Sequence, residues 1–192
     1  MRNRLLVAAI TIIVFGSLSQ PAAADIEKTN ADTLTVGAGA FDVIENHPIN
    51  PAFDYRLEYR SGYSLLANWT EPYVSIRPFG GFEGTSDGAA YGLGGFLFDI
   101  PLGKHFFITE SEGVGLFDSG DGKDMGSSIE FRSQLEAGYK FDNQSRVSIA
   151  INHISNAGIS QRNPGEESAV AYYSLPIDWL MNSGKDKTEN GK

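Results

Sequence analysis

Apolar and polar residues alternate along the segment that runs from Ile129 to Phe141. Every second position from Ile129 is mostly apolar, whereas the positions between them are mostly charged or amide residues, beginning with Glu130 and Arg132. Successive side chains of a β-strand point to opposite faces, so this pattern predicts a strand with one apolar face and one charged face. Residues 53–60 repeat the pattern with aromatic residues on the apolar face.

Segments of this kind recur along the chain and are separated by stretches rich in Gly, Asn and Asp, which is typical of an all-β protein. We predict strands at 33–43, 52–60, 72–80, 89–99, 104–116, 127–141, 145–155 and 167–178. Eight is an even number and the smallest common size of a membrane β-barrel. The pattern therefore predicts an eight-stranded antiparallel transmembrane β-barrel of the outer-membrane type.

A soluble β-sandwich or lipocalin-like barrel would show the same alternation, with the apolar face buried instead of turned to lipid. Two features favour the membrane barrel. The charged face carries both signs of charge together with glycine, which suits a narrow, salt-bridged lumen. Aromatic residues also gather near the predicted strand ends, as interfacial girdles require: Phe53, Tyr59, Tyr139, Phe141 and Trp179.

The predicted connections alternate in length. Those at 44–51, 81–88, 117–126 and 156–166 are long, whereas those at 100–103 and 142–144 are tight. Outer-membrane barrels have short periplasmic turns and long extracellular loops, so both termini are expected in the periplasm. The connection at 61–71 is long for a periplasmic turn and departs from this rule.

The N-terminus has the layout of a cleavable secretory signal. Arg2 and Arg4 precede an apolar run over 5–15, and three alanines at 22–24 precede Asp25. The run is shorter than the roughly 20 residues of a membrane-spanning helix, which is the alternative. We therefore predict a signal peptide at 1–24, a barrel domain at 25–180 located in the outer membrane, and a disordered polar tail at 181–192.

Composition excludes several classes of function. Removal of the signal changes the formal charge from −9 to −11, and such an acidic chain is a poor ligand for nucleic acid. The chain has no cysteine, which excludes disulfides, thiolate zinc ligands and thiol catalysis. Its three histidines are not spaced as a metal site requires, so we expect no metal and no cofactor. His47 and His105 are expected at the surface.

The predicted strand at 145–155 carries a candidate catalytic pair. His153 and Ser155 continue its apolar, lipid-facing parity, where unpartnered polar groups cost solvation free energy. Residues two apart share a face, so the imidazole can act as a base beside the hydroxyl. Glu167 has the lipid-facing parity of the next strand and can pair with His153 across the hairpin. Glu166 is adjacent, but parity favours Glu167.

The residues around this pair resemble those of the PagL-type lipid A 3-O-deacylases. The similarity lies in His153-Ile154-Ser155-Asn156-Ala157-Gly158 and in Asn163, Gly165 and Glu167, it extends upstream through 129–143, and it is strong over about 127–177. It implies that His153, Ser155 and Glu167 are the catalytic residues and that Asn156, Gly158 and Asn163 stabilise the oxyanion or shape the site. It also implies metal-free hydrolysis of the ester at position 3 of lipid A.

Two alternatives stay open at this stage. One is a small non-catalytic barrel in which His153 and Ser155 are an ordinary polar pair. The other is an outer-membrane phospholipase or acyltransferase. The expected partners are lipid A or lipopolysaccharide and the surrounding outer-membrane lipid, and a homodimer is left open. The glycine-rich stretch 80–95 is interpreted as loop and barrel glycines, and Asp118, Asp121 and Asp124 as a solvated hairpin.

Overall fold

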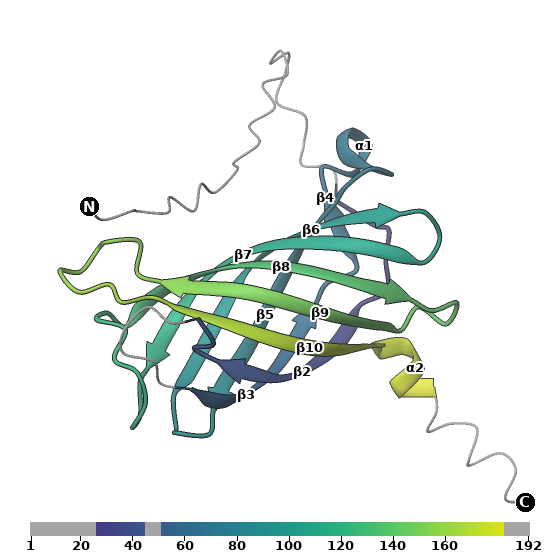
Figure 1. The fold of residues 1–192 in the computed structure, drawn as a ribbon. Coiled ribbons are helices and arrows are strands. Elements are labelled where there is room, and N and C mark those ends of the chain that lie inside the picture. Colours follow the sequence, from purple (N-terminus) through teal and green to yellow (C-terminus); the bar gives the residue numbers. More distant parts are fainter. Residues whose placement is uncertain (1–25, 45–50, 183–192) are drawn as a thin grey trace, which may run out of the picture.

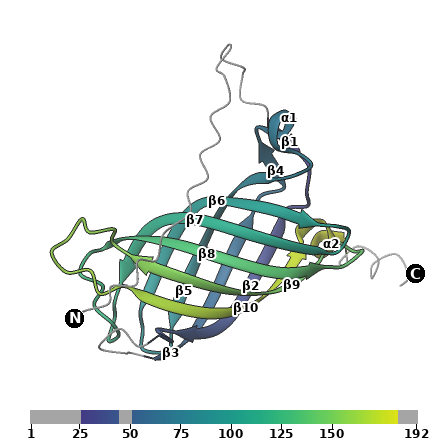
Figure 2. The same ribbon diagram turned by 45° about the horizontal axis from the view of Figure 1, so that its top comes forward.

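The computed structural model describes residues 26–44 and 51–182; the predicted signal peptide, His47 and the chain after 182 lie outside these ranges. Eight long antiparallel strands form a closed barrel (Figures 1 and 2). They are β2 (Thr33–Phe41), β3 (Ala52–Arg60), β5 (Ser75–Thr85), β6 (Ala90–Leu102), β7 (Phe106–Asp118), β8 (Ile129–Lys140), β9 (Arg146–Ser155) and β10 (Glu166–Pro176). The pairing of β5 with β6 closes the barrel, so the predicted fold class is confirmed.

The remaining elements are short. Strands β1 (Ile26–Lys28) and β4 (Tyr63–Leu65) pair with each other, and β4 also pairs with β5. Helix α1 (Ala67–Thr70) follows β4, and helix α2 (Ile177–Asn182) follows β10. Within the described ranges, no helix is long and apolar enough to cross a membrane. The unusual connection at 61–71 thus holds β4 and α1, which project from the barrel wall (Figure 2).

The predicted ends of the eight strands lie within three residues of the observed ones, except the end predicted at residue 80. The expected loop at 81–88 is instead the end of β5, and the connection to β6 covers only 86–89. The end of this strand was not predicted because glycines have no side chains and so show no alternation of apolar and polar residues. Glycine is needed at position 81 for close packing, because a Cβ there would lie 2.8 Å from the Leu57 carbonyl oxygen of β3. The strand expected up to residue 178 ends at Pro176, and helix α2 takes in residues 181 and 182, which were expected to be disordered.

The barrel is apolar outside and charged inside, as the alternation predicts. Along β8, exposed positions begin with Ile129 and alternate with buried positions that begin with Glu130. The lumen holds a network of ion pairs. Arg132 lies 2.7 Å from Glu58 and 3.4 Å from Glu83, and further pairs join Arg56–Asp54, Arg56–Glu83, Arg60–Glu58, Arg60–Glu136, Arg77–Asp99 and Arg146–Asp99.

One end of the barrel, here called the loop end, is where β2, β5, β7 and β9 end and where β3, β6, β8 and β10 begin. The connections 86–89, 119–128 and 156–165 lie there. At the opposite end Pro176 of β10 pairs with Thr33 of β2, so both ends of the barrel domain lie there (Figure 1). His105 at this opposite end stacks on Tyr139, with ring centroids 5.1 Å apart. His105 therefore packs against an aromatic ring of the barrel wall, in the place where an interfacial aromatic girdle is expected.

A buried apolar cluster fills the lumen toward the loop end. It includes Met125 of the 119–128 connection and Ile154 of β9, together with Phe41, Phe79, Ala89, Tyr91, Leu93, Leu97 and Phe117. Ile154 is completely buried, and its neighbours His153 and Ser155 therefore point to the outer face of the barrel. Inward packing of Ile154 holds the strand that carries the candidate site.

Candidate active site

His153 and Glu167 meet on the outer surface of the barrel near the loop end. They are directly opposite each other in the antiparallel pairing of β9 and β10. His153 Nδ1 lies 3.1 Å from Glu167 Oε1, and the two side chains are 49% and 24% exposed. With Nδ1–H donating to the carboxylate, Nε2 is left as a proton acceptor. The expected pairing of His153 with Glu167 is thus present.

Glu166 is turned to the other side of the wall. Its carboxylate is buried in the lumen and accepts hydrogen bonds from Asn152 Nδ2 at 3.1 Å and from Ser168 Oγ at 2.7 Å. It also accepts one from the backbone N–H of Asp42 at 3.3 Å. Glu166 therefore joins three elements at the mouth of the barrel and does not reach His153, in line with the parity argument.

Ser155 is the last residue of β9 and is half-buried. It shares the outward parity of His153 and pairs with Phe131 of β8. Among the hydrogen bonds of the described residues, none joins Ser155 to His153. Hydrogen bonds between a nucleophile and its base are often long or poorly aligned before substrate binds. The structure therefore places the imidazole and the hydroxyl on one face without a hydrogen bond between them.

A tight turn follows Ser155. Ile159 N–H donates to the Asn156 carbonyl at 3.0 Å, and both central residues, Ala157 and Gly158, have positive φ values of 52° and 81°. These angles resemble those of a type I′ turn, in which non-glycine residues are disfavoured. The strained backbone at Ala157 is held by the surrounding hydrogen bonds.

The buried side chain of Asn156 ties this turn to its neighbours. Its Nδ2 donates to the carbonyls of Met125 at 3.1 Å and Arg162 at 2.8 Å, and its Oδ1 accepts from Gly158 N–H at 3.0 Å. Asn163 Oδ1 accepts the Asn156 backbone N–H at 3.0 Å. Both amide hydrogens of Asn156 and the Gly158 N–H are thus engaged within the loop.

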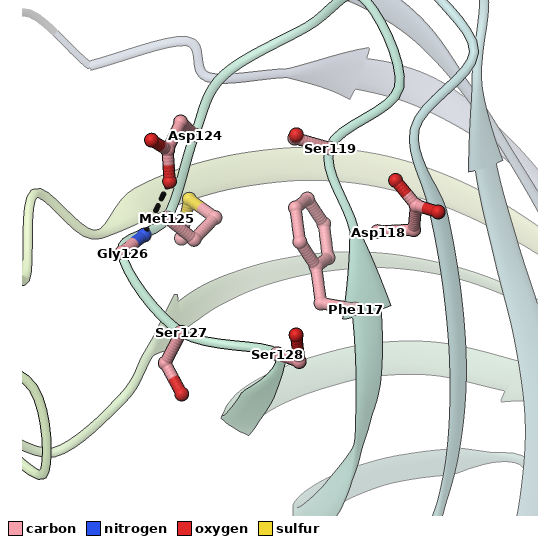
Figure 3. Close-up of a pocket in the computed structure, with 8 residues that line it drawn as sticks. All are labelled: Phe117, Asp118, Ser119, Asp124, Met125, Gly126, Ser127 and Ser128. Atoms are coloured by element: carbon pink, nitrogen blue, oxygen red, sulfur yellow. Dashed lines mark hydrogen bonds between the residues drawn. The ribbon is translucent and has the colours of Figure 1, made fainter.

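The connection 119–128 contacts the loop that follows Ser155. Arg162 lies 2.9 Å from the Asp124 carboxylate and donates to the Asp124 carbonyl at 2.8 Å. The N–H of Gly126 and the Arg162 guanidinium lower the pKa of the Asp124 carboxyl. A polar pocket of about 400 Å³ lies in this connection and is lined by Phe117, Asp118, Ser119, Asp124, Met125, Gly126, Ser127 and Ser128 (Figure 3). Its lining does not include His153 or Ser155.

Sequence reasoning missed this support. Met125 and Arg162 act through backbone carbonyl oxygens, which leave no signal in residue type. The pairing of Asp124 with Arg162 could be suggested only by their opposite charges. The aspartates of this connection were expected to be solvated, and Asp124 is exposed, but it also forms the link to the neighbouring loop. Over residues 26–44 and 51–182, no group of three His, Cys, Asp or Glu residues could hold a metal ion.

Gly165 packs against the candidate base, which leads to a prediction. Its φ is +66°, and a Cβ at this position would lie 2.9 Å from His153 Cε1. We expect Gly165→Ala to displace the imidazole and lower the rate of the reaction proposed below by about tenfold or more, because small misplacements of catalytic groups are costly. Initial rates of that reaction in detergent micelles measure this effect.

Gly103→Ala is the matched control for this variant. Gly103 also has a positive φ, +76°, but a Cβ there would have no neighbour within 4 Å. Both variants strain the backbone, but only the new Cβ of Gly165→Ala contacts the imidazole. Equal activities of the two variants would contradict a role for Gly165 in placing His153.

Comparisons with known proteins show the family of this chain. A family model described as "Lipid A 3-O-deacylase (PagL)" matches residues 54–176. The lipid A deacylase PagL of Pseudomonas aeruginosa is 40% identical over 74 residues, which cover 37% of this chain and 42% of that relative. The barrel is also similar to the crystal structure of the outer membrane enzyme PagL, with a TM-score of 0.56 and 24% identity; the match covers 75% of this chain and 99% of the solved one. This chain belongs to the PagL family of lipid A 3-O-deacylases.

Proposed function

We propose that this protein is an outer-membrane serine esterase that hydrolyses the ester-linked acyl chain at position 3 of lipid A. The observation that carries the proposal is the His153–Glu167 pair, 3.1 Å apart on the outer, apolar wall of the barrel in a chain of this family. A polar pair on such a wall costs solvation free energy. A substrate that reaches this position comes from the surrounding lipid, and the proposed substrate is an ester carried by a lipid.

In the proposed reaction, His153 Nε2 accepts the proton of Ser155 as Ser155 Oγ attacks the acyl carbonyl. The imidazolium then returns that proton to the sugar oxygen, which leaves as an alcohol. Water, deprotonated by His153, attacks the acyl-enzyme and releases the fatty acid, and Ser155 regains its proton. Glu167 Oε1 accepts the Nδ1–H of His153, which holds the tautomer and stabilises the imidazolium.

For the oxyanion we favour different roles for the three candidate residues. The side-chain amide of Asn156 and the N–H of Gly158 already donate within the loop, so we assign them to site architecture. Asn163 uses its Oδ1 as an acceptor, and no described hydrogen bond uses its Nδ2. We therefore infer that Asn163 Nδ2 is the side-chain donor that can turn to the developing negative charge.

The location of the site supports the outer leaflet as the place of reaction. The site lies at the loop end, opposite the end where both ends of the barrel domain lie. In outer-membrane barrels the longer loops face the outside and the termini face the periplasm. A signal peptide at 1–24 would supply the export that this location requires.

Mass spectrometry of lipid A from cells with and without the protein tests the proposal. We expect the protein to remove the mass of one hydroxy fatty acid. An unchanged lipid A accompanied by altered phospholipids would indicate the phospholipase or acyltransferase alternative. If neither lipid class changes, and the purified protein cleaves no acyl ester, the non-catalytic barrel is the correct interpretation.

A further inference from the structure

The connection 119–128 reaches two neighbours of the candidate site. The two residues that follow Lys123 contact the loop after β9, one through an ion pair and the other through its backbone carbonyl. Lys123 itself reaches in another direction, and its Nζ lies 2.7 Å from Oδ1 of Asp42, the residue that follows β2. One short segment thus binds both the loop after β9 and the end of β2, the strand that pairs with β10.

The ion pair between Lys123 and Asp42 is buried. The two side chains are 6% and 1% exposed. Replacement of a buried ion pair by apolar residues is often neutral or stabilising, so burial alone does not make such a pair a source of stability. Its charge-assisted hydrogen bond is short and directional, and it fixes the positions of the two groups that it joins. The pair is therefore suited to setting the geometry of the segments that carry it.

Asp42 forms a sharp turn of the backbone where β2 ends. Its φ is +55°, in the left-handed region that Asp adopts more readily than most residues. After this turn, the N–H of Val43 donates to the Glu167 carbonyl oxygen at 2.7 Å. The N–H of Asp42 itself donates to Glu166 Oε2 at 3.3 Å. The turn that Lys123 holds therefore bonds to the first two residues of β10.

Glu167 is held at two points. Val43 binds its main-chain carbonyl, and on the other side its Oε1 lies 3.1 Å from His153 Nδ1. The regular pairing of β10 with β2 begins only at Ala169 and Ala40. On the β2 side, the start of β10 therefore depends on the hydrogen bonds from the turn and not on the strand ladder.

We propose that Lys123 is a positioning residue: through the Asp42 turn, it holds the Glu167 carboxylate against the imidazole of the candidate site. The inference rests on the proposed esterase function and adds to it a residue that contacts neither His153 nor Ser155. Without the ammonium group, the buried carboxylate loses its cation and the turn changes its path. The bond from Val43 to Glu167 is then weakened, and a displaced carboxylate stabilises the imidazolium less well.

Lys123→Met tests the proposal, because it keeps an unbranched side chain and removes the charge. Full-length protein in detergent micelles is assayed by release of fatty acid from lipopolysaccharide. We expect kcat/KM to fall about tenfold, since small displacements of catalytic groups are costly. The acid limb of its pH profile should move to lower pH by about half a unit, because a displaced carboxylate favours the protonated imidazole less. A smaller folded fraction would instead lower the rate without moving the limb.

Lys104→Met is the matched control. It makes the same change in an ion pair of similar length, 2.8 Å to Asp142, at the opposite end of the barrel. Its rate and its pH profile should equal those of the wild type. A folded Lys123→Met protein with the wild-type rate, or with a lower rate and an unmoved acid limb, would overturn the proposal. Wild-type protein that releases no fatty acid at any pH would refute the esterase function itself.

Asp42→Asn is a second variant that is decisive if Lys123→Met does not form a closed barrel. The new amide oxygen still accepts a hydrogen bond from the ammonium group, and Asn also adopts a positive φ readily. We expect a smaller loss of rate, about threefold, as for a weakened hydrogen bond, with the acid limb moved in the same direction. In that case, a wild-type rate and pH profile in Asp42→Asn would contradict the positioning role of Lys123.

Discussion

Ser155→Ala should lower the rate of lipid A deacylation by a thousandfold or more while the barrel stays folded. Without Oγ there is no nucleophile, and removal of a nucleophilic serine typically costs this much or more. The hydroxyl is half-buried at the end of β9, and the strand is anchored by the inward packing of Ile154, so the substitution leaves the fold intact. Release of hydroxy fatty acid from purified lipopolysaccharide measures the rate.

Ser160→Ala is the control for this variant, because it makes the same change in the loop that follows β9, five positions beyond Ser155. It should retain the wild-type rate. The shift in electrophoretic mobility between unheated and heated samples reports whether each variant forms a closed barrel. A folded Ser155→Ala protein that deacylates as fast as the wild type would rule out the proposed mechanism.

Asp99→Ala should cause the largest loss of stability. Asp99 is buried in the lumen between two guanidinium groups, 3.0 Å from Arg77 and 2.8 Å from Arg146, and it accepts a hydrogen bond from Thr109 at 2.6 Å. Removing the carboxylate leaves two buried cations without their acid partner. Breaking a buried pair in this way costs about 3–5 kcal/mol of unfolding free energy. Urea-induced unfolding in lipid vesicles measures the change.

Asp142→Ala serves as its comparison. Asp142 lies 2.8 Å from Lys104, as close as Asp99 lies to Arg146, but both members of this pair are largely exposed: Asp142 lies in the turn between β8 and β9, and Lys104 in the turn between β6 and β7. Exposed ion pairs contribute little because water screens them. We expect no measurable change in the unfolding midpoint. Equal losses in the two variants would show that the lumen network does not depend on the Asp99 carboxylate.

Much of the fold follows from a two-residue period. Alternation placed β3 at 52–60 with both ends correct, and it placed β8 and β9 within two residues. The same period separated Glu167 from Glu166, since neighbours in a strand face opposite sides. The end of β5 was not predicted because its glycines have no side chains that could alternate. Helix α2 was not predicted because six residues are too few to show a helical period.

The sequence by itself determined which side chains face lipid and which face the lumen, because that choice depends only on parity within a strand. It therefore determined that His153, Ser155 and Glu167 share the outer face. The register between paired strands was decided only by the closed barrel. Ser133 comes beside His153, and Glu112 beside Ser133, through pairings that local pattern does not specify. The support of the site by Met125 and Arg162 likewise required the tertiary structure, because backbone carbonyl oxygens are common to every residue.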